Sequence, residues 1–148
     1  MQAQMLAPAA ALVAWTLVML VWTAATRLPA LNRMGGLKNA KPGGRGQDLE
    51  GILDDRINWK AHNYAHLVEQ PTLFYAVSLI LAVVGPHPQD VLFAWIYVAL
   101  RIVHSIWQAV VNVVAIRFLL FALATLALAV LTVHALMITL FANPGVVS

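Results

Sequence analysis

Hydrophobic residues form four long runs along the chain, and short polar segments separate them. The first run, from Leu6 to Thr26, contains no charged residue. A helix of this length spans roughly 30 Å, the thickness of a bilayer core. The pattern predicts an all-α, integral membrane four-helix bundle in a single domain over residues 1–148. The expected spans cover about residues 6–26, 61–84, 90–113 and 117–141.

A cleaved signal peptide is the alternative interpretation of the first run. Such a peptide starts with a positively charged segment, whereas residues 1–10 carry no Lys or Arg. The run is also longer than the apolar part of a signal peptide. We therefore expect this segment to be retained as a span.

The second span has to include polar residues. Its apolar part, residues 72–84, is too short to cross a bilayer before Gly85 and Pro86 end the helix. Pro71 lies inside the predicted helix and offers no N–H to the carbonyl of Leu67. We therefore predict a kink just after Glu69.

Residues 28–59 form the one long polar segment, which we expect to be a mobile, solvated connection. Asp54 and Asp55 near its end suit the first turn of the second helix. Seven of the nine Lys and Arg residues lie in or beside it: Arg27, Arg33, Lys38, Lys41, Arg45, Arg56 and Lys60. Cytoplasmic loops carry such an excess, so we predict a cytoplasmic loop 28–59, with the N- and C-termini outside.

Composition supports a membrane protein and limits the chemistry. The chain is 61% hydrophobic and 10% charged, against about 25% charged residues in soluble domains. The net charge of +3 comes from the biased loop, so we expect a lipid bilayer rather than nucleic acid as the partner. Cysteine is absent, so any thiol chemistry has to use a thiol from another molecule.

Two of the predicted helices each carry polar residues along one face. On the second helix these residues are His62, His66 and Glu69. On the third helix they are Arg101, His104, Gln108 and Asn112.

Charged groups inside a membrane are costly, and they usually meet a partner or water. Glu69 and Arg101 lie at depths that differ by about one helical turn, which predicts an ion pair within a subunit or across an interface. A purely structural role for the pair is one interpretation, and a water-filled ligand pocket is the other. Arg117 has two interpretations as well: an anchor at the membrane surface, or a guanidinium that stabilises an anion.

The chain resembles the MAPEG family, membrane-associated proteins in eicosanoid and glutathione metabolism, and in particular its bacterial-type members. The resemblance is strongest in Glu69-Gln70-Pro71-Thr72-Leu73-Phe74-Tyr75-Ala76, in Arg101-Ile102-Val103-His104-Ser105 and in Arg117-Phe118-Leu119-Leu120-Phe121-Ala122. The family places its catalytic arginine sixteen residues after the arginine of an Arg-x-x-His motif, and Arg117 follows Arg101 at that spacing.

The resemblance implies a homotrimer that binds glutathione between subunits and acts on a lipophilic small molecule. It implies a thiolate beside Arg117 and the peptide's amino group on Glu69. The other glutathione contacts it implies are Arg101, His104, His62, His66, Gln108 and Arg27. Three positions depart from the family pattern: His66 replaces an Asn, His62 an Arg and Gln108 a Tyr.

Three alternative functions are compatible with the residues. His62, His66, Glu69 and His104 are of the types that hold zinc or iron, although we expect no metal. Four short spans with a buried acid also suit a small proton-coupled transporter. The departures from the family pattern favour a non-catalytic binding or scaffold subunit.

Overall fold

The structure is a computed structural model that describes residues 1–39 and 41–141. Its main helices are α1 (Gln2–Arg33), α2 (Asp55–Glu69), α3 (Pro71–Val84), α4 (Pro88–Val110) and α5 (Val114–Leu140). Two short 3-10 helices, η1 (Leu37–Asn39) and η2 (Gly46–Leu49), lie between α1 and α2. The described residues contain no strand, so the predicted all-α fold is confirmed.

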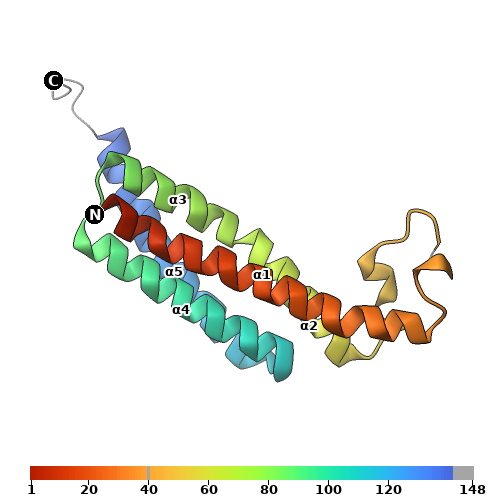
Figure 1. Ribbon diagram of the computed structural model, residues 1–148. Coiled ribbons are helices and arrows are strands. Elements are labelled where there is room, and N and C mark those ends of the chain that lie inside the picture. The colour runs from red at the N-terminus through yellow and green to blue at the C-terminus, as the bar shows by residue number, and fades with distance from the viewer. Residues whose placement is uncertain (40, 142–148) are drawn as a thin grey trace.

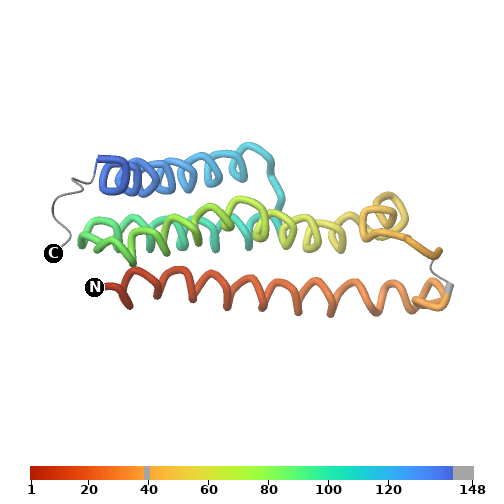
Figure 2. Tube along the Cα trace, turned by 90° about the horizontal axis from the view of Figure 1, so that it is seen from above, coloured from red at the N-terminus to blue at the C-terminus, as the bar shows by residue number. Residues whose placement is uncertain are grey.

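The helices form an elongated bundle (Figure 1). α1 packs against α2, α3 and α4, whereas α5 packs against α4 and α3. Figure 2 shows the result: α1 and α5 lie on opposite sides, and the other helices fill the space between them. The N-terminus and the end of α5 lie at one end of the bundle, and the connection from α1 to α2 lies at the other.

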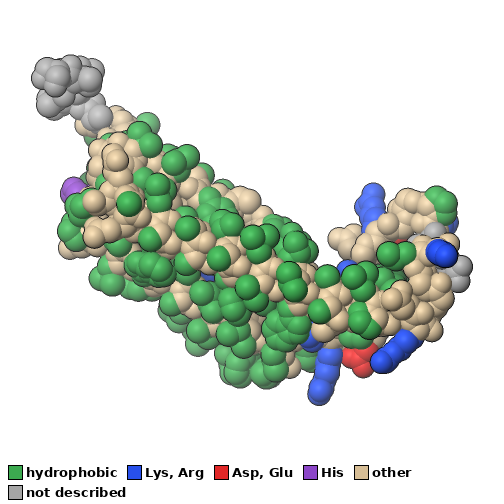
Figure 3. Space-filling model, viewed as in Figure 1, with side chains coloured by type: hydrophobic (Ala, Val, Ile, Leu, Met, Phe, Trp, Pro, Cys, Tyr) green, Lys and Arg blue, Asp and Glu red, His purple; other side chains and the backbone are tan. Residues whose placement is uncertain are grey.

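Four helical segments are long and apolar enough to cross a membrane, with α2 and α3 together forming the second. Much of their outer surface is apolar (Figure 3). Leu17, Leu79 and Leu126 are among the exposed apolar residues. The visible Lys and Arg side chains gather at the end formed by the connecting segment. An apolar belt with charges at one end suits a bilayer, so the chain is an integral, multi-pass membrane protein.

Much of the interior of the bundle is apolar. α1 buries Met5, Leu12 and Met19, which recur every seven residues and form one stripe along the helix. Phe74 of α3 stacks on Tyr97 of α4, with ring centroids 4.4 Å apart. These contacts fix α3 against α4 beside the polar residues of the third span.

The predicted break in the second span lies between α2 and α3. α2 ends at Glu69 and α3 starts at Pro71, whose missing N–H costs least at the start of a helix. Thr72 donates a hydrogen bond from its hydroxyl to the Glu69 carbonyl at 2.7 Å.

Asp54 caps the start of α2 by accepting from the Arg56 N–H at 2.8 Å.

The first helix extends further than predicted. The pattern ended it near Thr26, but α1 continues through Pro29 to Arg33. A single proline removes one backbone hydrogen bond, and Arg27, shortly before Pro29, donates to Asn58 of α2. The Thr23 hydroxyl donates to the carbonyls of Met19 and Lys60, which joins the two helices.

The third helix ends earlier than predicted. α4 stops at Val110, and Asn112 lies in the turn to α5 with φ +58°. Its N–H donates to the carbonyl of Trp107 at 2.8 Å. Asparagine tolerates this left-handed conformation better than most residues. The expectation that Asn112 continues the polar face of the third helix is therefore wrong.

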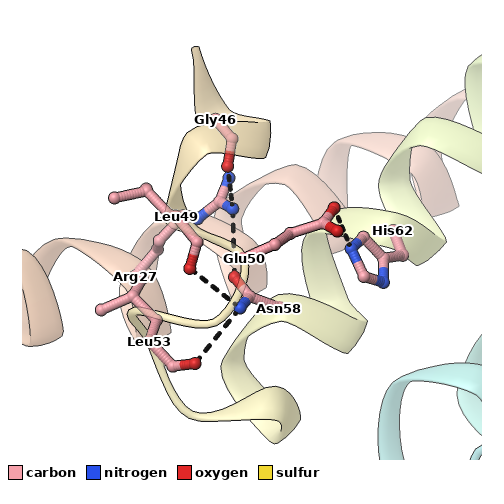
Figure 4. Close-up of polar contacts among 7 residues, drawn as sticks. All are labelled: Arg27, Gly46, Leu49, Glu50, Leu53, Asn58 and His62. Atoms are coloured by element: carbon pink, nitrogen blue, oxygen red, sulfur yellow. Dashed lines mark hydrogen bonds and ion pairs between the residues drawn. The ribbon is translucent and has the colours of Figure 1, made fainter. Parts of the chain in front are cut away.

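The connecting segment folds back onto α1 and α2 (Figure 4). Arg27 donates to the Gly46 carbonyl at 2.7 Å and to the side-chain oxygen of Asn58 at 3.2 Å. Asn58 in turn donates to the carbonyls of Leu49 and Leu53. Most of the segment is solvent-exposed, as expected, but these contacts tie its second half to the helices.

Candidate functional site

The polar residues of α4 share one buried face, as their spacing predicts. Arg101 is fully buried, and His104 and Gln108 are almost completely buried. The three side chains turn inward because positions three and four residues apart lie on the same side of a helix. They form the centre of the candidate site.

Arg101 is held by the backbone of α2. Its Nη2 donates a hydrogen bond to the carbonyl of His66, close to the break before Pro71. Its Nε and Nη1 have no hydrogen-bond partner in the described part of the chain. The same is true of His104 Nδ1 and Gln108 Oε1. Unpaired buried polar atoms are costly, so this region calls for a partner from outside the chain.

Glu69 does not pair with Arg101 within the chain. The Glu69 side chain is 66% exposed, and its carboxylate lies 3.5 Å from His66 Nδ1. The predicted ion pair within one subunit is therefore wrong, because Arg101 turns to the His66 carbonyl instead. A pair across a subunit interface stays a prediction.

A cavity of about 190 Å³ joins the polar residues of three helices. His66 of α2, His104 of α4 and Arg117 of α5 line it, together with the rings of Phe118 and Phe121. The imidazole rings of His66 and His104 meet edge to face, with centroids 6.1 Å apart. The cavity thus combines one cation and two imidazoles with an apolar wall.

Asn112 holds Arg117 at this cavity. Arg117 Nη1 donates to the side-chain oxygen of Asn112 at 2.7 Å. No carboxylate of the described residues lies within ion-pair distance of Arg117, so its positive charge is not neutralised. A partly buried, unneutralised guanidinium is suited to bind an anion.

Two predicted site residues lie elsewhere in the chain. His62 contacts Glu50 of the connecting segment, with 2.9 Å between Nε2 and Oε1 (Figure 4). Arg27 binds Gly46 and Asn58 in the same region. The structure therefore places His66, His104 and Arg117 at one cavity, whose lining includes neither His62 nor Arg27. Arg101 and Gln108 are buried on the same face of α4 as His104.

Sequence reasoning missed the amide and hydroxyl groups beside the site. Asn63 is fully buried and donates to the Ser105 hydroxyl at 2.8 Å, and Trp15 donates to the same oxygen at 3.0 Å. The Gln70 amide donates to the Thr125 hydroxyl at 2.8 Å, which links the break to α5. The sequence could have indicated these residues, because they lie within predicted spans and uncharged polar groups inside a membrane also need hydrogen-bond partners.

The residues proposed for a metal site do not form one. The described residues include no group of three His, Cys, Asp or Glu side chains close enough to hold a metal ion. His62 instead contacts Glu50 of the connecting segment.

The fold and the site define the class of protein: a four-helix membrane bundle with an arginine and two histidines at one cavity. The sequence model of the MAPEG family matches residues 5–137. The chain therefore belongs to the MAPEG family. No curated protein and no solved structure matches the chain significantly.

Proposed function

We propose that the protein binds glutathione as a cosubstrate and transfers its thiolate to a lipophilic molecule, or uses it for isomerisation or peroxide reduction. The observation that carries the proposal is the unneutralised guanidinium of Arg117 beside His66 and His104. Family membership supports it, and the absence of cysteine means that the thiol comes from the ligand.

A single guanidinium is enough to activate the thiol. A cysteine-like thiol has a pKa of about 8.5, so only a few per cent is thiolate at neutral pH. Lowering this pKa by about two units requires roughly 2.7 kcal/mol of preference for the anion. A guanidinium about 4 Å away supplies about 4 kcal/mol at an effective dielectric constant of 20. Arg117 therefore needs no second cation.

The other residues have binding roles in this proposal. The exposed carboxylate of Glu69 receives the amino group of the peptide. Arg101, with two unpaired guanidinium nitrogens, and His104 supply further polar contacts. The lipophilic substrate enters from the bilayer past Phe118, which is 70% exposed.

The size of the cavity supports a site shared between subunits. Ligand pockets usually measure about 300–1,000 Å³, whereas the cavity of one chain measures about 190 Å³. A tripeptide needs additional walls, and a neighbouring copy in a homotrimer would provide them. In such an assembly His62 and Arg27 would contact glutathione only from a neighbouring copy.

Thiolate formation tests the role of Arg117. Adding glutathione to the purified protein at neutral pH should produce the ultraviolet absorbance of a thiolate. Arg117→Ala should abolish it, whereas Arg117→Lys should retain part of it because the charge remains. Equal signals from the wild type and Arg117→Ala would disprove the role of Arg117. Arg33→Ala, which removes an exposed arginine far from the cavity, is the matched control.

A non-catalytic binding subunit is the second candidate. The contact between His62 and Glu50 favours it, because the family's glutathione-using members have an arginine at this position and His62 is engaged elsewhere. Glutathione that raises the thermal stability of the protein without forming a thiolate would support this alternative.

A further inference from the structure

A second polar cluster lies at the opposite end of α5 from Arg117. Asp90 of α4 is almost completely buried, and its Oδ1 lies 2.7 Å from Nδ1 of His134 on α5. The ring of His87 lies beside that of His134, with centroids 4.9 Å apart. His134 follows Arg117 by a distance of roughly 25 Å along the helix, so the two sites are separate.

This cluster forms the polar end of a larger cavity. The cavity measures about 560 Å³, within the usual range for small-molecule sites. Beyond His87, Asp90 and His134, its wall is largely apolar and includes Phe93, Leu126 and Val130. Leu126 lies two turns before His134, toward the middle of the span. The polar end of the cavity is therefore near the membrane surface and its apolar part lies deeper. This order matches the head group and the hydrocarbon chains of a membrane lipid.

The hydrogen bonds define what the polar end offers to a ligand. Asp90 Oδ2 accepts from the backbone N–H of His87 at 2.7 Å, at the positive end of α4. A carboxylate only accepts hydrogen bonds, so the ring nitrogen that faces Asp90 Oδ1 is the donor. His134 Nδ1 consequently carries the hydrogen that Asp90 Oδ1 accepts, and in this tautomer Nε2 is the acceptor that is left for a ligand.

We propose that this cavity is a second ligand site, which binds a lipophilic molecule headed by a hydroxyl group. The hydroxyl donates to His134 Nε2, and the apolar part lies against Phe93, Leu126 and Val130. No Lys or Arg of the described chain lines the cavity. Fatty acids and other lipophilic anions are disfavoured, because the Asp90 carboxylate lies at the polar end and no lysine or arginine of the described lining balances a second negative charge. The proposal does not depend on glutathione.

Photo-crosslinking in phosphatidylcholine nanodiscs tests this site. The probe is a long-chain alcohol with a diazirine in its chain, and mass spectrometry locates the label. We expect labels on the residues of α4 and α5 that line the cavity. Dodecanol should compete about tenfold better than dodecanoate or dodecane, because only the alcohol donates a hydrogen bond to Nε2. Equal competition by all three compounds, or no label at the cavity, would overturn the proposal.

Asp90→Asn provides a sharper test in the same assay. The side-chain oxygen of the asparagine still accepts from the His87 N–H, so its amide N–H₂ faces His134 and moves the ring hydrogen to Nε2. The preference for dodecanol over dodecanoate should be lost. Asp48→Asn is the matched control. Asp48 accepts a hydrogen bond from the Arg45 N–H at the start of η2, as Asp90 does from the His87 N–H. The substitution changes the net charge by the same amount as Asp90→Asn. A preference unchanged in Asp90→Asn would overturn the proposal. If Asp90→Asn does not fold, the competition by dodecanol, dodecanoate and dodecane in the wild type tests the proposal by itself.

Discussion

Asn112 determines how much of the charge on Arg117 is available to a ligand. It is the only side-chain partner of Arg117 in the described part of the chain, and it is neutral. Asn112→Asp should keep the acceptor and the backbone conformation but place a carboxylate on the guanidinium. We expect thiolate formation with glutathione to fall at least tenfold, since the cation is then neutralised within the protein.

Asn112→Gly, studied by the same absorbance measurement, tests the position of the Arg117 guanidinium separately from its charge. Glycine adopts φ +58° without strain but leaves Arg117 without its acceptor. The loss of one hydrogen bond of about 1 kcal/mol should reduce thiolate formation by roughly fivefold. If Asn112→Gly reduced thiolate formation more than Asn112→Asp, the charge of the Arg117 guanidinium would matter less than its position, contrary to this prediction.

The sequence predicts which residues share a helix face but not which atoms they meet. Arg101, His104 and Gln108 lie together because their spacing is a local property of the helix. The partner of Arg101 is a backbone carbonyl, which no side-chain pattern reveals. The contact of His62 with Glu50 depends on the path of the connecting segment and was equally invisible.

The sequence predicts which segments are helices more reliably than the residues at which those helices end. The apolar runs identify all four membrane-spanning segments, because a bilayer fixes the length that a span requires. The end of α1 depends on a tertiary contact with α2 beyond the predicted span, the hydrogen bond from Arg27 to Asn58. The end of α4 depends on Asn112, whose backbone conformation the helical pattern did not indicate.

The connecting segment should loosen when Arg27 is removed. Arg27→Ala eliminates two hydrogen bonds, to Gly46 and to Asn58, worth roughly 1–2 kcal/mol together. A protease without sequence preference should cut the segment about 5–30 times faster, since local opening governs cleavage. Arg33→Ala removes a charge from the exposed end of α1 and is the matched control. Equal cleavage rates for the two variants would contradict the proposed role of Arg27.

At the scale of the whole molecule, the incomplete cavity predicts a site shared between copies of the chain. Native mass spectrometry should find three copies in each particle. Arg117→Ala and Glu69→Gln should each abolish thiolate formation when every copy carries the change. Mixed particles that contain both variants should regain part of the signal, because an intact Glu69 and an intact Arg117 then meet at some interfaces. No recovery in mixed particles would mean that each site uses one chain only.

The length of α1 has a consequence for kinetics. Its 32 residues extend about 48 Å, well beyond a bilayer core of roughly 30 Å. The projecting turns carry the exposed connecting segment beyond the apolar core. The start of α5, whose first turn carries Arg117, lies on the side of the bundle toward that segment (Figure 2). In the proposed reaction, a water-soluble and a lipid-soluble reactant therefore meet without either leaving its own phase. The rate then follows the mole fraction of the lipophile in the membrane, so added inert lipid slows turnover and added buffer has no such effect at a fixed glutathione concentration.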